Sequence, residues 1–146
     1  MVSFEARIRA IIEESRVARL VTVDVDDNNI PQPYLVPTVF VFDGKHFFIP
    51  FDKKSKKVSI EKSRRLKNIQ KNPNVVILID EYSDDWSKLF FVMIRGSAKI
   101  IEEEEKKLLV RAHKLLLLKY PQYKNVGIGR SCIMIDPRKV IFWRNS

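Results

Sequence analysis

The chain has 146 residues, 45% of them hydrophobic, and a formal net charge of +9. A chain of this length can bury one hydrophobic core without disulfide or metal cross-links. Its 4 glycines and 7 prolines leave little room for a flexible linker, so we expect a single domain over residues 1–146. Its one cysteine, Cys132, excludes an intrachain disulfide and a cysteine-rich metal site. The absence of any long apolar segment predicts a cytoplasmic protein with no membrane partner.

The positive charge is concentrated in one segment of the chain. Residues 53–71 contain nine lysines and arginines and one acid, a net charge of +8, which leaves +1 for the remainder. A loop and helix with this much charge indicate a compact anion site, whereas a nucleic-acid surface more often spreads its charge over a face. A nucleic-acid-binding barrel that uses the cluster is the alternative, and we rank it below the anion site.

The chain begins with a predicted helix followed by a predicted strand. Apolar residues recur at helical spacing over residues 4–15, and Ser3 is available as the capping residue. Residues 20–25 are rich in β-branched side chains and end at a cluster of turn formers, residues 26–29. The pattern therefore predicts a helix, a strand and a hairpin.

The next predicted strand, residues 30–42, is interrupted by Pro31, Pro33 and Pro37, none of which can donate a backbone hydrogen bond. One interpretation is an ordinary edge strand. The other is that backbone groups left free by the prolines face the polar rim of a planar heterocycle. The residues favour neither interpretation over the other. A hairpin turn at Asp43-Gly44 then leads into a strand over 46–51.

The second half of the chain predicts two more helices and four more strands. The elements are a helix that follows the basic loop and ends at Asn72-Pro73, strands at 75–79 and 89–101, a helix that begins at 102–105 and ends before Pro121, and strands at 131–135 and 140–144. Gly96 predicts a bulge in the long strand. Six or seven antiparallel strands with about three helices indicate a mainly β barrel of α+β class.

Conventional catalytic side chains are scarce, and we assign no catalytic residue. His46 and His113 fall in a predicted strand and helix and read as structural, while Cys132 reads as a core residue. Redox chemistry would then need a cofactor, held by loop lysines whose bonds to a phosphate are each worth roughly 1.5–3 kcal/mol. Trp86 and Trp143 are the aromatic candidates for shaping a ring site, and we expect no metal.

A series of motifs follows in order along most of the chain. They are Ala18-Arg19-Leu20-Val21-Thr22-Val23, Pro33-Tyr34-Leu35-Val36-Pro37-Thr38-Val39-Phe40, Asp52-Lys53-Lys54-Ser55-Lys56, Arg65-Leu66-Lys67-Asn68-Ile69, Asn72-Pro73, Asp84-Asp85-Trp86-Ser87 and Tyr120-Pro121-Gln122-Tyr123. The series resembles the FMN-binding split barrels related to pyridoxamine 5′-phosphate oxidase, especially their branch of deazaflavin (F420)-dependent enzymes. The resemblance implies a split β-barrel that forms a homodimer with two cofactor sites at the interface.

The resemblance also implies which residues bind the cofactor. The loop after the third strand would hold the phosphate, and the strands before it would line the ring. The next hairpin and the last strand would reach the site, in part from the other subunit. The implied residues are Val36, Pro37, Thr38, Ile49, Pro50, Phe51, Lys54, Ser55, Lys56, Lys57, Trp86, Ser87 and Trp143.

Three departures from the family pattern argue against vitamin B6 oxidation. Ser55 stands where the family usually has proline, no basic residue stands near Tyr34, and residues 141–146 lack the arginine- and histidine-containing signature of the oxidases. The sequence therefore predicts an oxidoreductase that transfers hydride to or from a small organic substrate, with FMN as first choice and F420 as the alternative. A flavin-binding carrier without turnover is the rival function.

Overall fold

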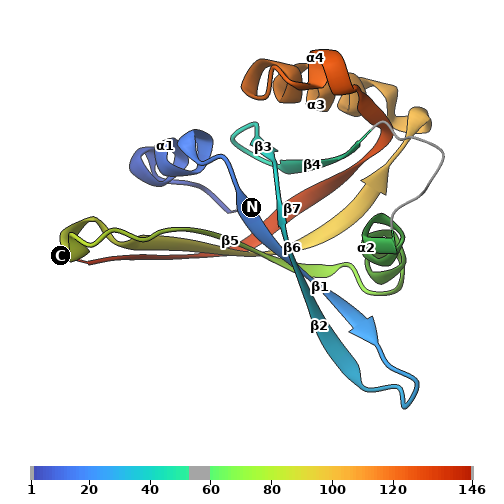
Figure 1. Ribbon diagram of the computed structural model, residues 1–146, viewed down its shortest axis with the longest axis horizontal. Coiled ribbons are helices and arrows are strands. Elements are labelled where there is room, and N and C mark those ends of the chain that lie inside the picture. The colour runs from blue at the N-terminus through green and yellow to red at the C-terminus, as the bar shows by residue number, and fades with distance from the viewer. Residues whose placement is uncertain (1, 53–59, 146) are drawn as a thin grey trace.

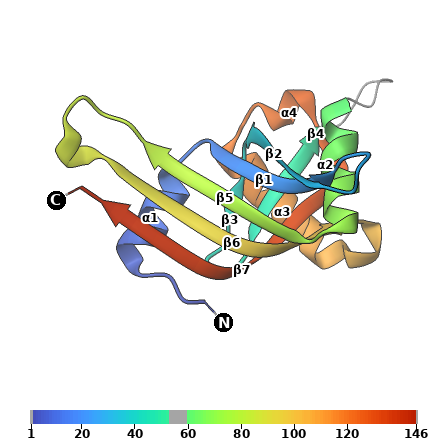
Figure 2. The ribbon, with the colours of Figure 1, turned by 90° about the horizontal axis from the view of Figure 1, so that it is seen from below.

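The computed structural model describes residues 2–52 and 60–145. Figures 1 and 2 show one long, strongly twisted sheet with helices packed against it. The elements are α1 (Ala6–Glu14), β1 (Ala18–Val25), β2 (Pro31–Thr38), β3 (Val41–Phe42), β4 (Phe47–Asp52), α2 (Ile60–Lys71), β5 (Asn74–Glu81), η1 (Trp86–Lys88), β6 (Phe90–Ile101), η2 (Glu103–Glu105), α3 (Lys106–Lys119), α4 (Tyr123–Val126) and β7 (Ile128–Arg144).

The seven strands form a single antiparallel sheet in the order β2-β1-β5-β6-β7-β4-β3. The two strands at the ends of this order, β2 and β3, are consecutive in the chain and are linked only by Val39 and Phe40. The sheet must therefore curl until its two edges approach each other, which is the geometry of a split barrel. This confirms the predicted fold class.

Two cores form on the two faces of the curled part of the sheet. Alternate residues of β4 point to opposite faces. Phe47, Ile49 and Phe51 belong to the core inside the curl, which also receives Ile8 and Ile12 of α1. Phe48 belongs to the second core, beneath α3. The β4 strand is thus apolar on both faces and reads as a continuous hydrophobic run.

The prolines lie on an edge strand, as one interpretation of the sequence requires. The β2 strand pairs with β1 over all eight residues and has no neighbour on its other side among the described strands. Pro31, Pro33 and Pro37 occupy alternate positions, so their nitrogen atoms all face away from β1 and the ladder loses no donor. The open edge keeps carbonyl acceptors at these positions. Contact between that edge and a heterocycle stays a prediction.

Two local predictions are wrong. Ser3 does not cap the first helix, whose N-cap position is Glu5 with no side-chain capping bond. The two last predicted strands are one strand, β7, because the chain passes a bulge without leaving the sheet. Gly96 lies opposite Pro137 whereas Arg95 lies opposite Lys139, so the bulge predicted at Gly96 is present but its extra residue is on β7.

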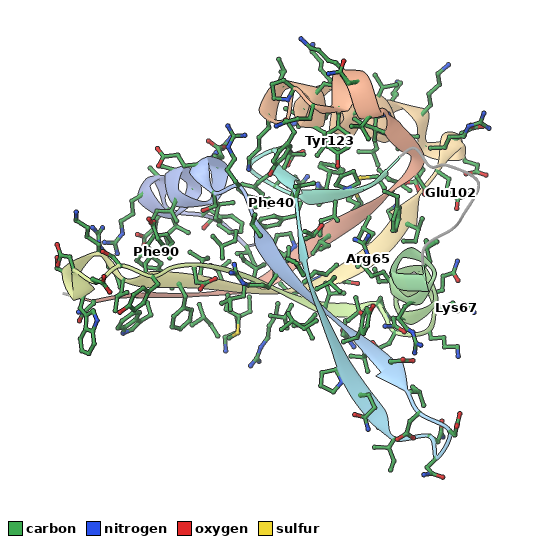
Figure 3. The ribbon with its side chains drawn as sticks, viewed as in Figure 1. Phe40, Arg65, Lys67, Phe90, Glu102 and Tyr123 are labelled. Carbon is green, nitrogen blue, oxygen red and sulfur yellow. The ribbon has the colours of Figure 1, made fainter. Side chains whose placement is uncertain are left out.

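The helix α2 is fastened to the sheet by buried polar contacts. The Asn68 side-chain amide donates to the Thr22 hydroxyl at 2.9 Å, and both side chains are buried. One turn earlier the buried Arg65 guanidinium lies 4.9 Å from the centre of the Phe51 ring. Figure 3 shows Arg65 on the sheet side of α2 and Lys67 on its other side. These contacts fix the position of α2 on the sheet.

We expect Asn68→Ala to lower the free energy of unfolding by about 1–3 kcal/mol, because it leaves the buried Thr22 hydroxyl without its partner. Gln70→Ala is the matched control, since Gln70 is an exposed residue of the same helix and its loss should change stability by less than about 0.5 kcal/mol. Urea unfolding curves of the two variants measure the difference. Equal stability would show that the buried amide does not hold α2.

Candidate functional site

The described residues of the predicted site fall into two groups that lie far apart in the chain's fold. Val36, Pro37 and Thr38 of β2 and Ile49, Pro50 and Phe51 of β4 form the first group, at the split of the barrel. Trp86, Ser87 and Trp143 form the second, at the far end of the sheet near the C-terminus, whereas α2 lies at the opposite end (Figure 2). Lys54, Ser55, Lys56 and Lys57 lie outside the described residues.

The side chains of β4 are committed to the core. Ile49 and Phe51 have relative exposures of 0% and 1%, and Pro50 is also buried. A ring placed along this strand would therefore meet its backbone and not these side chains. The Cys132 thiol donates to the Ile49 carbonyl at 3.2 Å, and burial raises the pKa of Cys132 to about 12. Cys132 is thus a protonated core thiol, as the sequence predicts.

The β2 residues are more accessible than those of β4. Val36 and Thr38 are half-buried and Pro37 is exposed. Val36 packs against the core that contains Ile49 and Phe51, which brings β2 and β4 to the same core across the split. The Thr38 hydroxyl donates to the Val39 carbonyl at 3.0 Å. The first group is therefore brought together, as a backbone surface with few exposed side chains.

Three buried polar residues at this end were not among the predicted site residues. They are Thr22, Arg65 and Asn68. Arg65 is the notable one, because a charged group is costly to bury unless it has partners. The sequence did contain a signal for it, since Arg65 falls on the apolar stripe of its helix. Nearby, Arg64 forms an ion pair with Asp24, and its guanidinium lies 6.0 Å from the Tyr34 ring.

The pKa of Asp24 is held below its usual range, chiefly by the backbone N–H of Val25 and next by Arg64. The ion pair with Arg64 joins α2 to the β1 strand on the solvent side. Because Arg64 is exposed and Asp24 is only partly buried, this pair contributes little to stability. Arg64 and Arg65 thus place two cations in the part of α2 that lies against β1 and Phe51.

The second group is an ordered aromatic turn. The Trp143 ring stacks on Phe91, with ring centres 5.9 Å apart and planes inclined by 22°. Asn145 donates its side-chain amide to the Trp86 carbonyl at 2.7 Å, and the Ser87 hydroxyl donates to Asp85 at 2.7 Å. Trp86 and Trp143 are 64% and 44% exposed. Within one chain, these rings face solvent and touch none of the first group.

Between the two groups runs an apolar sheet face that no described helix covers. Cross-strand pairing places these apolar side chains on one face: Val21, Val23, Leu35, Val76, Leu78, Phe91, Met93, Ile141 and Trp143. The same pairing places four charged residues on that face, Arg19, Asp80, Arg95 and Lys139, of which Arg19 and Asp80 form an ion pair. Each is only partly buried or exposed, and the helices α1 and α3 lie on the other side of the sheet (Figure 1). We call this surface the open face. A hollow of about 310 Å³ on it is lined in part by Val21, Val76 and Arg95.

The described residues offer no metal centre and no membrane span. Outside the undescribed segments, no group of three or more potential ligands lies together. In the same part of the chain, none of the helices has the length and apolarity needed to cross a bilayer. His113 is half-buried on α3, where burial lowers its pKa, and His46, just before β4, lies 3.9 Å from Asp136.

The family model for pyridoxamine 5′-phosphate oxidase matches residues 4–144, and the chain belongs to this family. No curated protein matches the chain. The resemblance drawn from the sequence motifs is thereby confirmed for the family, and the seven-stranded antiparallel sheet agrees with it.

Several solved structures share the fold. A conserved hypothetical protein from Mycobacterium tuberculosis aligns with a TM-score of 0.72 and 23% identity over 99% of this chain and 87% of that one. An FAD-binding protein from Mesorhizobium loti aligns with a TM-score of 0.66 and 17% identity, covering 95% and 94% of the two chains. The heme storage protein HutZ from Vibrio cholerae gives 0.67 and 15%, covering 98% and 95%. At these identities the structures support the fold alone.

Proposed function

We propose that the protein is a homodimeric flavin- or deazaflavin-dependent oxidoreductase that transfers hydride to or from a small organic substrate. The observation that supports it most is the open face, an apolar surface with a basic end and an aromatic end. Monomeric proteins rarely expose large apolar patches, and such patches mark interaction sites. FMN is the first choice of cofactor and F420 the alternative, and family membership supports a flavin in general.

Pairing of two open faces would complete each site. A closed dimer uses the same patch on both copies, related by a two-fold axis. If the two-fold axis lies in the plane of the interface and is perpendicular to the strands, the two ends of the open face exchange. The aromatic turn of one chain would then lie against the split of the partner's barrel and its basic segment. The separation of Trp86 and Trp143 from β4 within one chain is then expected, because the two halves of a site come from different subunits.

This chain's residues would bind and orient the cofactor. Lys54, Lys56 and Lys57 would hold its phosphate, and the β2 and β4 backbones would line its ring. The buried Arg65 guanidinium and the α2 contacts would position the end of the loop. When bound, the ring would carry the hydride, which is chemistry that the described side chains do not supply. The partner's Trp143 would close one side of the ring and exclude water.

The rival proposal is a carrier or storage module that binds without turnover. The heme storage neighbour makes heme a specific case. Heme needs an axial ligand, and His46 and His113 both lie away from the open face. Heme storage is therefore less well supported than flavin binding. Multiple turnovers of reduced nicotinamide or reduced deazaflavin by the purified protein would establish an enzyme; binding with no turnover would establish the carrier.

Replacement of Lys54 and Lys56 together by alanine should weaken FMN binding at least tenfold, because each lost charge-assisted bond to the phosphate is worth roughly 1.5–3 kcal/mol. Stability should change little, since charged surface groups contribute little to it. Lys106→Ala with Lys114→Ala, two exposed lysines of α3, is the matched control. Fluorescence titration with FMN and with F420 measures both. Equal affinity of the two double variants would remove the basic loop from the site.

Leu35→Glu should convert the dimer into a monomer, because it places a carboxylate in the apolar interface. Leu35 is 61% exposed in the single chain, so the monomer should still fold. Val126→Glu, at a residue of α4 with 57% exposure, is the matched control and should leave the dimer intact. Light scattering after size-exclusion chromatography gives the mass. A Leu35→Glu dimer, or a wild-type monomer, would contradict the open-face interface.

A further inference from the structure

A second pocket lies on the other side of the molecule from the open face. It is bounded by α1, α3 and the turn between β3 and β4, and its volume is about 420 Å³. Figure 1 shows α1 and α3 flanking the β3–β4 hairpin, with α2 beyond the hairpin's far side. The pocket therefore shares no wall with the proposed cofactor site, and its size lies within the range of small-molecule sites.

The turn between β3 and β4 binds one arginine of this pocket and lies against another. The Asp43 carboxylate accepts hydrogen bonds from the backbone N–H groups of Lys45 and His46 at 2.8 and 2.7 Å. These bonds orient the carboxylate for its ion pair with Arg111 at 3.3 Å. Gly44 has φ +94°, and a Cβ there would lie 2.5 Å from an Arg9 nitrogen. Only glycine thus lets the Arg9 guanidinium lie against the turn.

The pocket carries more positive than negative charge. Its lining contains Arg9, Arg111 and Lys119 against Glu13 and Asp43. Arg9 pairs with Glu13 at 2.7 Å and Arg111 pairs with Asp43, which leaves Lys119 as the cation in excess.

The Lys119 ammonium is only partly compensated by the described residues, since the Glu13 carboxylate offsets some of the cost of its burial. Its nitrogen is buried with no hydrogen-bond partner among them and lies 4.0 Å from the centre of the Phe40 ring. Burial first, and the nearby Arg16 second, lower the pKa of Lys119 to about 8, so the ammonium still carries its charge at neutral pH. A desolvated cation of this kind gains from pairing with an anion.

The remaining walls are apolar. Val41 and Phe42 of β3 and Leu115 and Leu118 of α3 line the pocket beside the charged groups. Leu118 is 73% exposed and lines the hollow, so a bound ligand would cover it. Apolar walls with a few convergent charged groups are typical of sites for small organic molecules. One surplus positive charge matches a ligand with one negative charge.

We propose that this pocket binds a small organic monocarboxylate with an apolar body, such as a medium-chain fatty acid. The carboxylate lies beside Arg9 and Arg111, and the Lys119 ammonium, whose nitrogen is covered in the structure, turns toward the pocket to donate to it. The alkyl chain covers Phe42, Leu115 and Leu118. The pocket is a site in addition to the cofactor site and does not depend on the proposed redox function.

Calorimetric titration of the full chain with sodium octanoate at pH 7 tests the proposal. We expect saturable binding of one octanoate per chain, with octan-1-ol and octylamine at least tenfold weaker because neither carries a negative charge. Arg111→Gln and Lys119→Met should each weaken octanoate binding at least tenfold. Arg130→Gln, at a highly exposed arginine of β7, is the matched control and should bind as the wild type does.

The result that would overturn the proposal is octanoate binding that is absent, equal to that of octan-1-ol, or unchanged in both Arg111→Gln and Lys119→Met. Lys119→Met should remain folded, because it replaces a partly buried cation by an apolar side chain of similar length, and circular dichroism checks this. FMN titration in the presence of saturating octanoate separates the two sites. Unchanged FMN affinity supports a second pocket, and competition would place the octanoate in the cofactor site and overturn it.

Discussion

The two-residue link between β2 and β3 is the constraint on which the rest of the fold depends. These strands end the sheet on opposite sides, so Val39 and Phe40 can join them only if the sheet curls. Phe40 is buried, and the Tyr120 hydroxyl contacts its carbonyl at 3.0 Å and the Arg16 carbonyl at 2.9 Å. Desolvation is the main reason that the pKa of Tyr120 is raised, so the hydroxyl keeps the proton it donates. The closed end is thus tied to the residues just before β1 and just after α3.

Curling encloses one face of the long strands and leaves the other open. In β6, Val92 and Ile94 are buried inside while Phe91 and Met93 lie on the open face. A strand that is apolar on both faces normally lies between two layers, and the described chain supplies one. The open face and the separation of the two residue groups therefore have a single explanation if a second copy provides the missing layer and half of each site.

The sequence predicted the elements better than their assembly. The prolines of β2, the Asp43-Gly44 turn and the β-branched runs each carry a local physical signal, and the structure contains an edge strand, a hairpin and strands at those places. The run Phe90–Ile94 has no alternation of polarity, so it could not show which face is core. Nor could spacing show that Trp86 and Phe51 lie apart, because that depends on how the sheet curls. The cap expected at Ser3 failed because the helix starts later, after Glu5.

A subunit-complementation measurement tests most directly whether each cofactor site is shared between two chains. One variant lacks the basic loop's Lys54 and Lys56, and the other lacks the rings of Trp86 and Trp143. Each homodimer then has only defective sites. If the sites are shared, a mixed dimer contains one site with both halves intact, and co-purified mixed dimers should bind one FMN per dimer with wild-type affinity. Mixed dimers that bind no better than either parent would contradict the account, because a site within one chain cannot be restored by its neighbour.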